Sequence, residues 1–120
     1  MADPQHPAAQ ARRISLIINR HAGQQVVQGE PLARQLTDYF MEQGCEVTLY
    51  QPEDDSSFDQ VIAQALQQQA ERAGVLVAAG GDGTLNSIAH RLRQAQQHTP
   101  ALAEVSLGII PLGTFNYVAR

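Results

Sequence analysis

The chain has 120 residues, of which 43% are hydrophobic and 17% charged, and its formal net charge is −4. This composition excludes an intrinsically disordered protein, and the acidic balance argues against a nucleic-acid partner. All eight permanent side-chain cations are arginines, which excludes the P-loop and the protein-kinase strand motif, because both need a lysine on the nucleotide phosphates.

Length and local signals predict one domain preceded by a tail. Residues 1–12 carry no hydrophobic periodicity and are expected to be a flexible N-terminal tail, so the domain would span residues 13–120. No apolar run approaches the roughly 18 residues that cross a bilayer, and the N-terminus lacks a secretory signal, which predicts a cytoplasmic protein. Cys45 is the single cysteine, and it is expected to be a small buried residue in a strand.

In chain order, short apolar runs rich in β-branched residues alternate with stretches of helical spacing. Residues 20–30 are expected to form a loop, and Ser57 with Gln60 is expected to form a capping box that begins the second helix. The glutamine run "LQQQA" in that helix is expected on its exposed face. The predicted strands are 13–19, 45–50, 75–79 and 105–111, and the predicted helices are 31–44, 57–73 and 85–96.

This alternation predicts an α/β fold with an open, mostly parallel sheet and helices on both faces, joined by right-handed crossovers. Ligands of such sheets bind at the carboxyl ends of the strands. That rule selects residues 18–25, 80–86 and 111–120, all of which contain Gly with Asn or Thr. The apolar helix residues expected to face the sheet are Leu32, Leu36, Tyr39, Phe40, Phe58, Val61, Ile62, Ala65 and Leu66.

Three glycines, Gly80, Gly81 and Gly83, lie between a predicted buried strand and a predicted helix. Backbone N–H groups and the helix dipole favour an anion there, and glycine lets the main chain approach phosphate oxygens without a Cβ in the way. The dinucleotide pattern G-x-G-x-x-G is incomplete, because Asn86 occupies its last position. A tight turn with no ligand is the structural alternative.

Asp82 lies among these glycines and would repel a phosphate. Its presence therefore suggests a metal partner or a proton acceptor. The alternative is an N-cap of the following helix, a role that Thr84 could also fill. His21 in the first loop and His90 in the third helix fit surface positions better than catalytic ones.

The motifs "GGDGT" and "PLGTFNYVAR" together resemble the catalytic domain of diacylglycerol-kinase-type lipid kinases, which share a fold with sphingosine kinases and NAD kinases. The resemblance runs from Arg13 to the end of the chain, with "INRHAG" in the place of the family's Asn-Pro-x-Ala-Gly turn. It implies ATP and Mg²⁺ as cofactors, and it places Asp82 near the transferred phosphoryl group as the catalytic residue. The nucleotide-binding residues that it implies are Asn19, Gly80, Gly81, Asp82, Gly83, Thr84, Gly113, Thr114 and Asn116.

The chain departs from the family pattern at three positions. Arg20 stands where the family usually has proline, which would loosen the first turn or add a phosphate contact. Phe115 replaces a small residue, and Tyr117 replaces the usual aspartate, which puts an acidic role there in doubt. Family members also continue into a β-rich second domain that forms the lipid pocket and supplies further carboxylates.

We therefore expect the ATP-binding domain of a lipid kinase, truncated before its second domain and inactive alone. The whole enzyme would transfer the γ-phosphoryl group of ATP to the hydroxyl of a diacylglycerol-like or sphingoid lipid. An NAD kinase-like enzyme stays open as an alternative, as does a non-catalytic nucleotide-binding module if the natural chain ends at Arg120. The expected partners are a nucleotide and a lipid bound through an absent segment, with no nucleic acid; peripheral membrane contact and homo-oligomers stay open.

Overall fold

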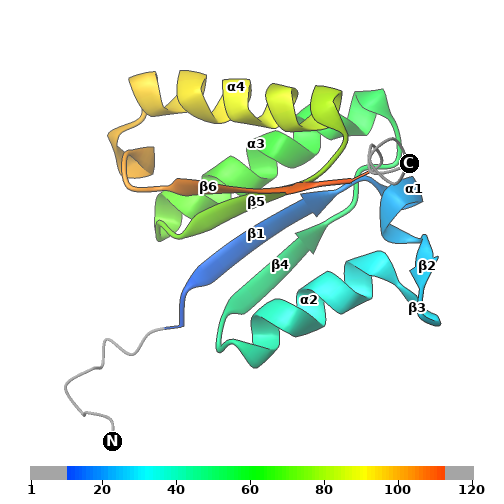
Figure 1. Ribbon diagram of the computed structural model, residues 1–120. Helices are drawn as coiled ribbons and strands as arrows, with labels where there is room; N and C mark the ends of the chain where they lie inside the picture. Colours follow the sequence, from blue (N-terminus) through cyan, green and yellow to red (C-terminus); the bar gives the residue numbers. More distant parts are fainter. Residues whose placement is uncertain (1–10, 113–120) are drawn as a thin grey trace, which may run out of the picture.

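The computed structural model of the chain describes residues 11–112. A four-stranded parallel sheet in the order β4-β1-β5-β6 forms its centre (Figure 1). This arrangement confirms the open parallel α/β fold expected from the sequence. The elements are β1 (Arg13–Ile18), α1 (Arg20–Gly23), β2 (Val26–Val27), β3 (Glu30–Pro31), α2 (Leu32–Glu42), β4 (Glu46–Tyr50), α3 (Asp55–Glu71), β5 (Val75–Gly80), α4 (Asp82–His98), the 3₁₀ turn η2 (Pro100–Leu102) and β6 (Ser106–Pro111).

Strand β1 lies in the interior of the sheet and is buried on both faces. Its residue Ile14 is in register with Val47 of β4 and with Val75 of β5. All of its residues after Arg13 are buried, as a continuous apolar run in a parallel sheet predicts. The apolar run "RISLII" therefore specifies both the strand and its central place.

The helices form one layer on each face of the sheet. Helices α3 and α4 pack on the face that carries Ile17 and Leu76, whereas α2 packs on the face that carries Leu16 and Ile18. Figure 1 shows α2 beneath β1 and β4, on the opposite side from α3 and α4. The chain moves one way along the sheet from β1 to β4 and the other way afterwards, and right-handed crossovers in opposite directions place their helices on opposite faces.

The connection after β1 differs from the expected loop. It contains the short helix α1 and an antiparallel hairpin in which Val26 pairs with Pro31 and Val27 with Glu30. Gln28 and Gly29 form the turn of this hairpin, with φ angles of 56° and 88°. Two-residue hairpin turns favour positive φ at these positions, and the sequence analysis did not take "QG" as such a signal.

The structure corrects three further expectations. The capping box of α3 consists of Asp54 and Ser57, three residues before the predicted pair. On α2, Tyr39 is 55% exposed rather than directed into the sheet, and its ring contacts the edge of Phe40 at a centroid distance of 5.4 Å. Cys45 is half-buried immediately before β4 rather than within a strand.

The glutamine run of α3 lies only partly on the exposed face expected for it, since Gln67 is exposed whereas Gln68 is half-buried and Gln69 is buried. Gln69 is 0% exposed, and its side chain donates to the Ser15 hydroxyl at 2.9 Å and accepts the Gly74 backbone N–H at 2.7 Å. The neighbouring Gln68 accepts hydrogen bonds from the hydroxyls of Ser15 and Tyr50, and burial raises the pKa of the Tyr50 hydroxyl above its usual 10.0. These amides satisfy the polar groups that the sheet buries beneath α3.

Replacement of Gln69 by leucine should destabilise the fold. Leucine fills a similar volume but leaves the Gly74 N–H without its acceptor, whereas the Ser15 hydroxyl keeps its bond to Gln68; an unsatisfied buried group costs about 1–3 kcal/mol. We expect Gln69→Leu to lower the free energy of unfolding, measured by urea denaturation, by about 2 kcal/mol or more. The matched control is Gln67→Leu on the same helix, where the side chain is exposed. Equal stability of the two variants would contradict the structural role of Gln69.

Candidate functional site

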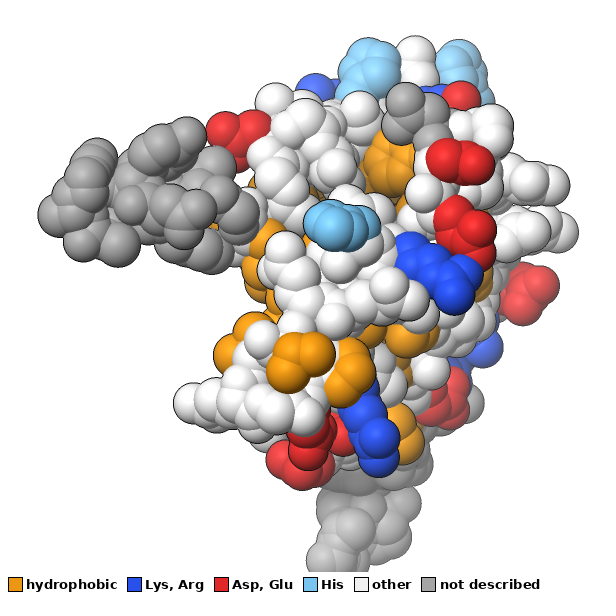
Figure 2. Space-filling view, turned by 90° about the vertical axis from the view of Figure 1, so that its right-hand side faces the viewer, with side chains coloured by type: hydrophobic (Ala, Val, Ile, Leu, Met, Phe, Trp, Pro, Cys, Tyr) orange, Lys and Arg blue, Asp and Glu red, His pale blue; other side chains and the backbone are white. Residues whose placement is uncertain are grey.

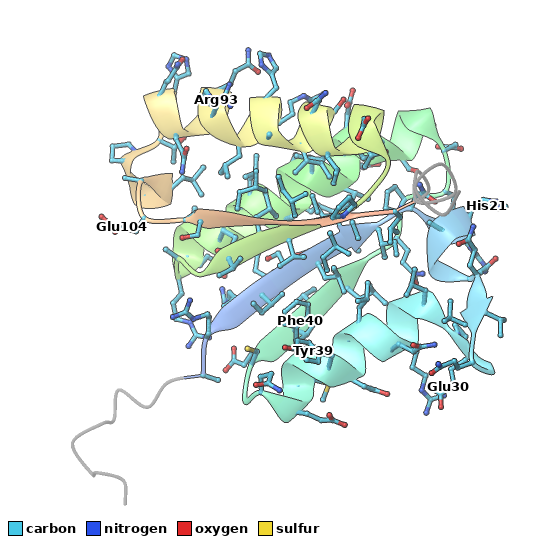
Figure 3. The ribbon with its side chains drawn as sticks, viewed as in Figure 1. His21, Glu30, Tyr39, Phe40, Arg93 and Glu104 are labelled. Carbon is cyan, nitrogen blue, oxygen red and sulfur yellow. The ribbon has the colours of Figure 1, made fainter. Side chains whose placement is uncertain are left out.

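The candidate site lies at the carboxyl ends of β1 and β5, where the strand order reverses. From β1 the chain passes to β4, then returns beyond β1 to β5. Loops that leave two adjacent strands in opposite directions open a crevice, which is the usual ligand position in open α/β sheets. Figure 3 shows His21 at this end of the sheet and Glu104 at the opposite end. A cavity of about 610 Å³ opens here, lined by Asn19, His21, Pro52, Glu53, Asp54, Phe58, Gly83, Thr84 and Ser87.

The glycine turn brings the start of α4 to one wall of this cavity. Gly80 ends β5, and Gly81 is the N-cap residue of α4 with no side-chain capping bond. The first backbone N–H groups of a helix have no partner within the helix. Gly83 lines the cavity, and a Cβ built on it would meet nothing within 4 Å. The main chain at Gly83 is therefore open to an incoming group.

Asp82 is the first residue of α4, and its side chain is exposed. It makes no hydrogen bond or ion pair with any residue in the described part of the chain. The N-cap alternative is wrong for both Asp82 and Thr84, because the cap position is occupied by Gly81 without a side-chain bond. The Asp82 carboxylate lies at a helix N-terminus, where a negative charge interacts favourably with the helix dipole. No contact with a described residue gives this carboxylate a structural role.

Asn19 follows β1 and forms the opposite wall of the cavity. Its side-chain oxygen accepts the Ala22 backbone N–H at 2.7 Å and so caps α1. This bond fixes the amide orientation and leaves the side-chain NH₂ as a donor. Arg20 donates its backbone N–H to the Pro52 carbonyl at 2.9 Å, and its guanidinium pairs with Glu53. A proline at position 20, which the family usually has, could not donate that backbone hydrogen bond. Arg20 therefore connects the first turn to the β4–α3 loop.

The β4–α3 loop supplies residues that the sequence analysis did not select. Its residues Pro52, Glu53 and Asp54 line the cavity, together with Phe58 of α3 and Ser87 of α4. The carboxyl-end rule applies to β4 as it does to the other strands, so "QPEDDSS" carried the signal. Ser87 lies one turn beyond Thr84 on α4, and helical spacing predicts that the two share a face.

Of the residues predicted for the site, Asn19, Gly83 and Thr84 line one cavity. Gly80, Gly81 and Asp82 form the turn beside it. Gly113, Thr114 and Asn116 lie outside the described residues. His21, which was judged a surface residue, also lines the cavity.

Charges of both signs lie near the site. Figure 2 shows acidic and basic side chains interspersed over the face formed by the carboxyl ends of the strands. Within residues 11–112, no group of three or more His, Cys, Asp or Glu side chains is placed to hold a metal ion. In the same range, no helix is long and apolar enough to cross a membrane. A separate cavity of about 620 Å³ lies beside α1 and α2 and includes none of the glycine-turn residues.

The fold and the glycine turn define an open α/β domain with a cavity at the reversal of strand order. Comparison with known sequences gives the family: the diacylglycerol kinase catalytic domain matches residues 13–120. The chain belongs to the diacylglycerol kinase catalytic domain family.

Individual relatives agree with this assignment. The chain is 32% identical over 88 residues to a probable lipid kinase YegS-like of Stenotrophomonas maltophilia, covering 73% of this chain and 27% of that protein. It is 36% identical over 77 residues to a diacylglycerol kinase of Staphylococcus saprophyticus, covering 64% of this chain and 22% of that protein. The matches therefore span about a quarter of the length of these relatives. No solved structure matches the chain significantly.

Gly83→Ala should separate ligand binding from folding. The new methyl group meets no protein atom within 4 Å but faces the cavity, so we expect the free energy of unfolding to change by less than about 1 kcal/mol. We expect the Kd for ATP, measured by calorimetry on the 120-residue chain, to rise about tenfold through loss of one main-chain contact. The contrasting variant is Gly80→Ala, whose Cβ would lie 3.0 Å from Thr84 carbons. This variant should weaken ATP binding and also lower the free energy of unfolding. Unchanged ATP affinity in Gly83→Ala would make the turn structural only.

The Asp54 carboxylate, which caps α3, should make the stability of the fold depend on pH in the acid range. The Ser57 backbone N–H, followed by the hydroxyls of Ser56 and Ser57, lowers the pKa of Asp54 below its usual 3.8. A lowered folded-state pKa stabilises the protein above the unfolded-state value, and this stabilisation is lost as the pH falls through the folded-state value. Asp54→Asn keeps a capping oxygen but removes the charge, so its stability should fall less between about pH 5 and pH 3. Parallel acid-unfolding curves for the two proteins would contradict this role.

Proposed function

We propose that this domain binds ATP in the cavity between α1, the β4–α3 loop and α4. In the whole protein, the γ-phosphoryl group of that ATP would pass to the hydroxyl of a diacylglycerol-like or sphingoid lipid. The chain spans about a quarter of its relatives' length, so the acceptor site is assigned to a β-rich second domain beyond residue 120. Access to a lipid acceptor would require peripheral contact with a membrane.

One observation carries this proposal: the open main chain at Gly83 shares a cavity with the donor amide of Asn19. Unpaired backbone N–H groups at the start of α4 suit the phosphate oxygens. A side-chain NH₂ from the facing wall gives a second donor without adding charge. Neither role needs a lysine, which the chain lacks.

Asp82 is proposed as the proton acceptor for the lipid hydroxyl. As the hydroxyl oxygen bonds to the γ-phosphorus, the bond to the ADP oxygen breaks and the hydroxyl proton passes to a carboxylate. Asp82 is the acidic residue of the glycine turn, and no contact with a described residue neutralises it. Its position at the helix start leaves it beside the phosphate site rather than within its wall.

Mg²⁺ fits this site as an ion carried by the nucleotide. Protein sites for Mg²⁺ commonly use one or two carboxylates together with substrate phosphates and waters. The described residues do not offer a cluster of three acidic or imidazole ligands, so the nucleotide phosphates would hold the ion together with groups of the second domain, and Asp82 would stay free to accept the proton. When bound, the ion neutralises charge on the transferred group.

The family match favours a lipid kinase over the NAD kinase-like alternative, because it is the diacylglycerol kinase catalytic domain that matches residues 13–120. The printed names of the relatives refer to lipid kinase and diacylglycerol kinase. An assay of the whole protein with a panel of diacylglycerols, sphingosine and NAD would decide between these acceptors. Phosphorylation of NAD but of no lipid would overturn the proposal.

Asp82→Asn in the longer parent protein should abolish turnover without unfolding the domain. Loss of a general base typically lowers kcat by about 100-fold or more, whereas an exposed side chain without a described partner adds little to stability. The measurement is lipid phosphorylation with labelled ATP, beside thermal unfolding of the same preparations. Glu104→Gln is the matched control, because Glu104 is exposed at the far end of the sheet (Figure 3). Activity of Asp82→Asn within a few-fold of the parent would remove Asp82 from the mechanism.

A further inference from the structure

A cavity of about 620 Å³ lies beside α1 and α2, and the site described above does not use it. Its lining comes mostly from α1, β3, α2 and β4, at the end of the sheet where Figure 1 shows α1 and the β2–β3 hairpin. It shares no lining residue with the cavity assigned to ATP. Cavities of about 300–1,000 Å³ hold small organic ligands, so this one is large enough for a ligand of its own.

Two arginines give this cavity a positive side. Arg20 of α1 and Arg34 of α2 both line it. Arg34 lies 3.8 Å from the Asp38 carboxylate and makes no hydrogen bond to a described residue. Arg20 pairs with Glu53, but a guanidinium has five N–H donors, so one carboxylate leaves donors open. Exposed ion pairs of this kind are weak, whereas a phosphate accepts paired hydrogen bonds from guanidinium groups.

An amide donor lines the same cavity. Gln51 follows β4 and is half-buried, and its side chain makes no hydrogen bond to a described residue. A Cβ built on Gly23 would lie 2.7 Å from the Gln51 Nε2 atom, so a larger residue at position 23 would displace the amide. Gly23 has no positive φ that would otherwise require glycine. Asp38 is the single carboxylate in the lining, so the lining favours an anion.

Apolar residues complete the lining, namely Pro31, Ala33 and Leu49. Leu49 is 36% exposed although it lies in a strand of the main sheet. Pro31 pairs with Val26, whose side chain is 66% exposed, so apolar surface continues from the cavity onto the hairpin. Figure 2 shows hydrophobic and basic side chains next to one another in the lower part of this end of the molecule. A ligand with an anionic part and an apolar part matches such a surface.

We propose that this cavity binds a phosphate ester that carries an apolar group, which is the chemistry of an anionic phospholipid. The phosphate would accept hydrogen bonds from Arg20, Arg34 and Gln51. The apolar group would lie along Leu49 and Val26. Soluble phosphate monoesters offer the same anion without the apolar group, so they should bind more weakly. The inference rests on the lining of this cavity and does not depend on ATP binding in the other one.

Backbone-amide NMR on the 120-residue chain can locate the ligand. The probes are dihexanoyl phosphatidic acid, kept below its critical micelle concentration, and glycerol phosphate. Both should shift the signals of Ala33, Thr37 and Leu49, which line this cavity, and not those of Gly83 and Ser87, which line the other. We expect the Kd of the phosphatidic acid to be at least about fivefold lower than that of glycerol phosphate, because its acyl chains bury apolar surface.

Arg34→Gln tests the positive side of the cavity. This variant should raise the Kd of both probes at least about fivefold, because it removes charge-assisted hydrogen bonds. The matched control is Arg93→Gln, which removes the same charge from an exposed position on α4 (Figure 3). It should change either Kd by less than about twofold, since a distant exposed charge is screened by salt.

A third variant separates the two parts of the ligand. Val26→Ser should raise the Kd of the phosphatidic acid about threefold and leave that of glycerol phosphate unchanged. Circular dichroism must show that each variant is folded; Gln51→Ala replaces Arg34→Gln if that variant is not. Equal affinity for the two probes would overturn the phospholipid assignment. Signal shifts confined to Gly83 and Ser87, or an unchanged Kd in Arg34→Gln, would overturn the site itself.

Discussion

Two-sided burial of β1 is the constraint on which the rest of the domain depends. Leu16 and Ile18 join the cluster beneath α2, and Ile17 joins the cluster beneath α3 and α4. The same five consecutive buried residues, Ile14 to Ile18, therefore hold both helix layers. Ser15 is the one polar member, and the buried amide of Gln69 accommodates its hydroxyl. An apolar strand with a single hydroxyl thus requires a polar partner from the helix above it.

The position of the candidate site follows from this strand. Asn19 comes immediately after the buried run, and Gly80 ends the adjacent strand β5, so the two walls of the cavity begin from neighbouring, rigid strands. The third wall is connected to the first by the Arg20–Pro52 backbone bond. The backbone around such a site needs little rearrangement to bind a ligand. The side chains that line the site can differ among family members without changing the fold.

The sequence was sufficient to predict the elements that local patterns specify. The four apolar runs gave the four strands of the main sheet, and the crossover rule gave their parallel pairing and the edge on which to look for a ligand. The failures depended either on contacts distant in the chain or on an unusual local backbone conformation. The local sequence predicts that Gln69 is exposed to solvent, because its partner Ser15 lies more than fifty positions away in the chain. The β2–β3 hairpin depends on positive φ at Gln28, a conformation uncommon outside glycine. Phe58 and Glu53 join the cavity only because β4 lies beside β1.

The strand order also governs when the core can form during synthesis. Ile14 pairs with Val47 and with Val75, so β1 gains its second neighbour only after the chain has grown past β5. Until then an apolar strand is open along one edge, where another unfinished chain could pair with it. Pairings between residues so far apart also slow folding, since the intervening loops must close before the contacts form. A ribosome-bound chain of this family should therefore be most prone to aggregate before β5 has emerged, and the appearance of β5 should end that period.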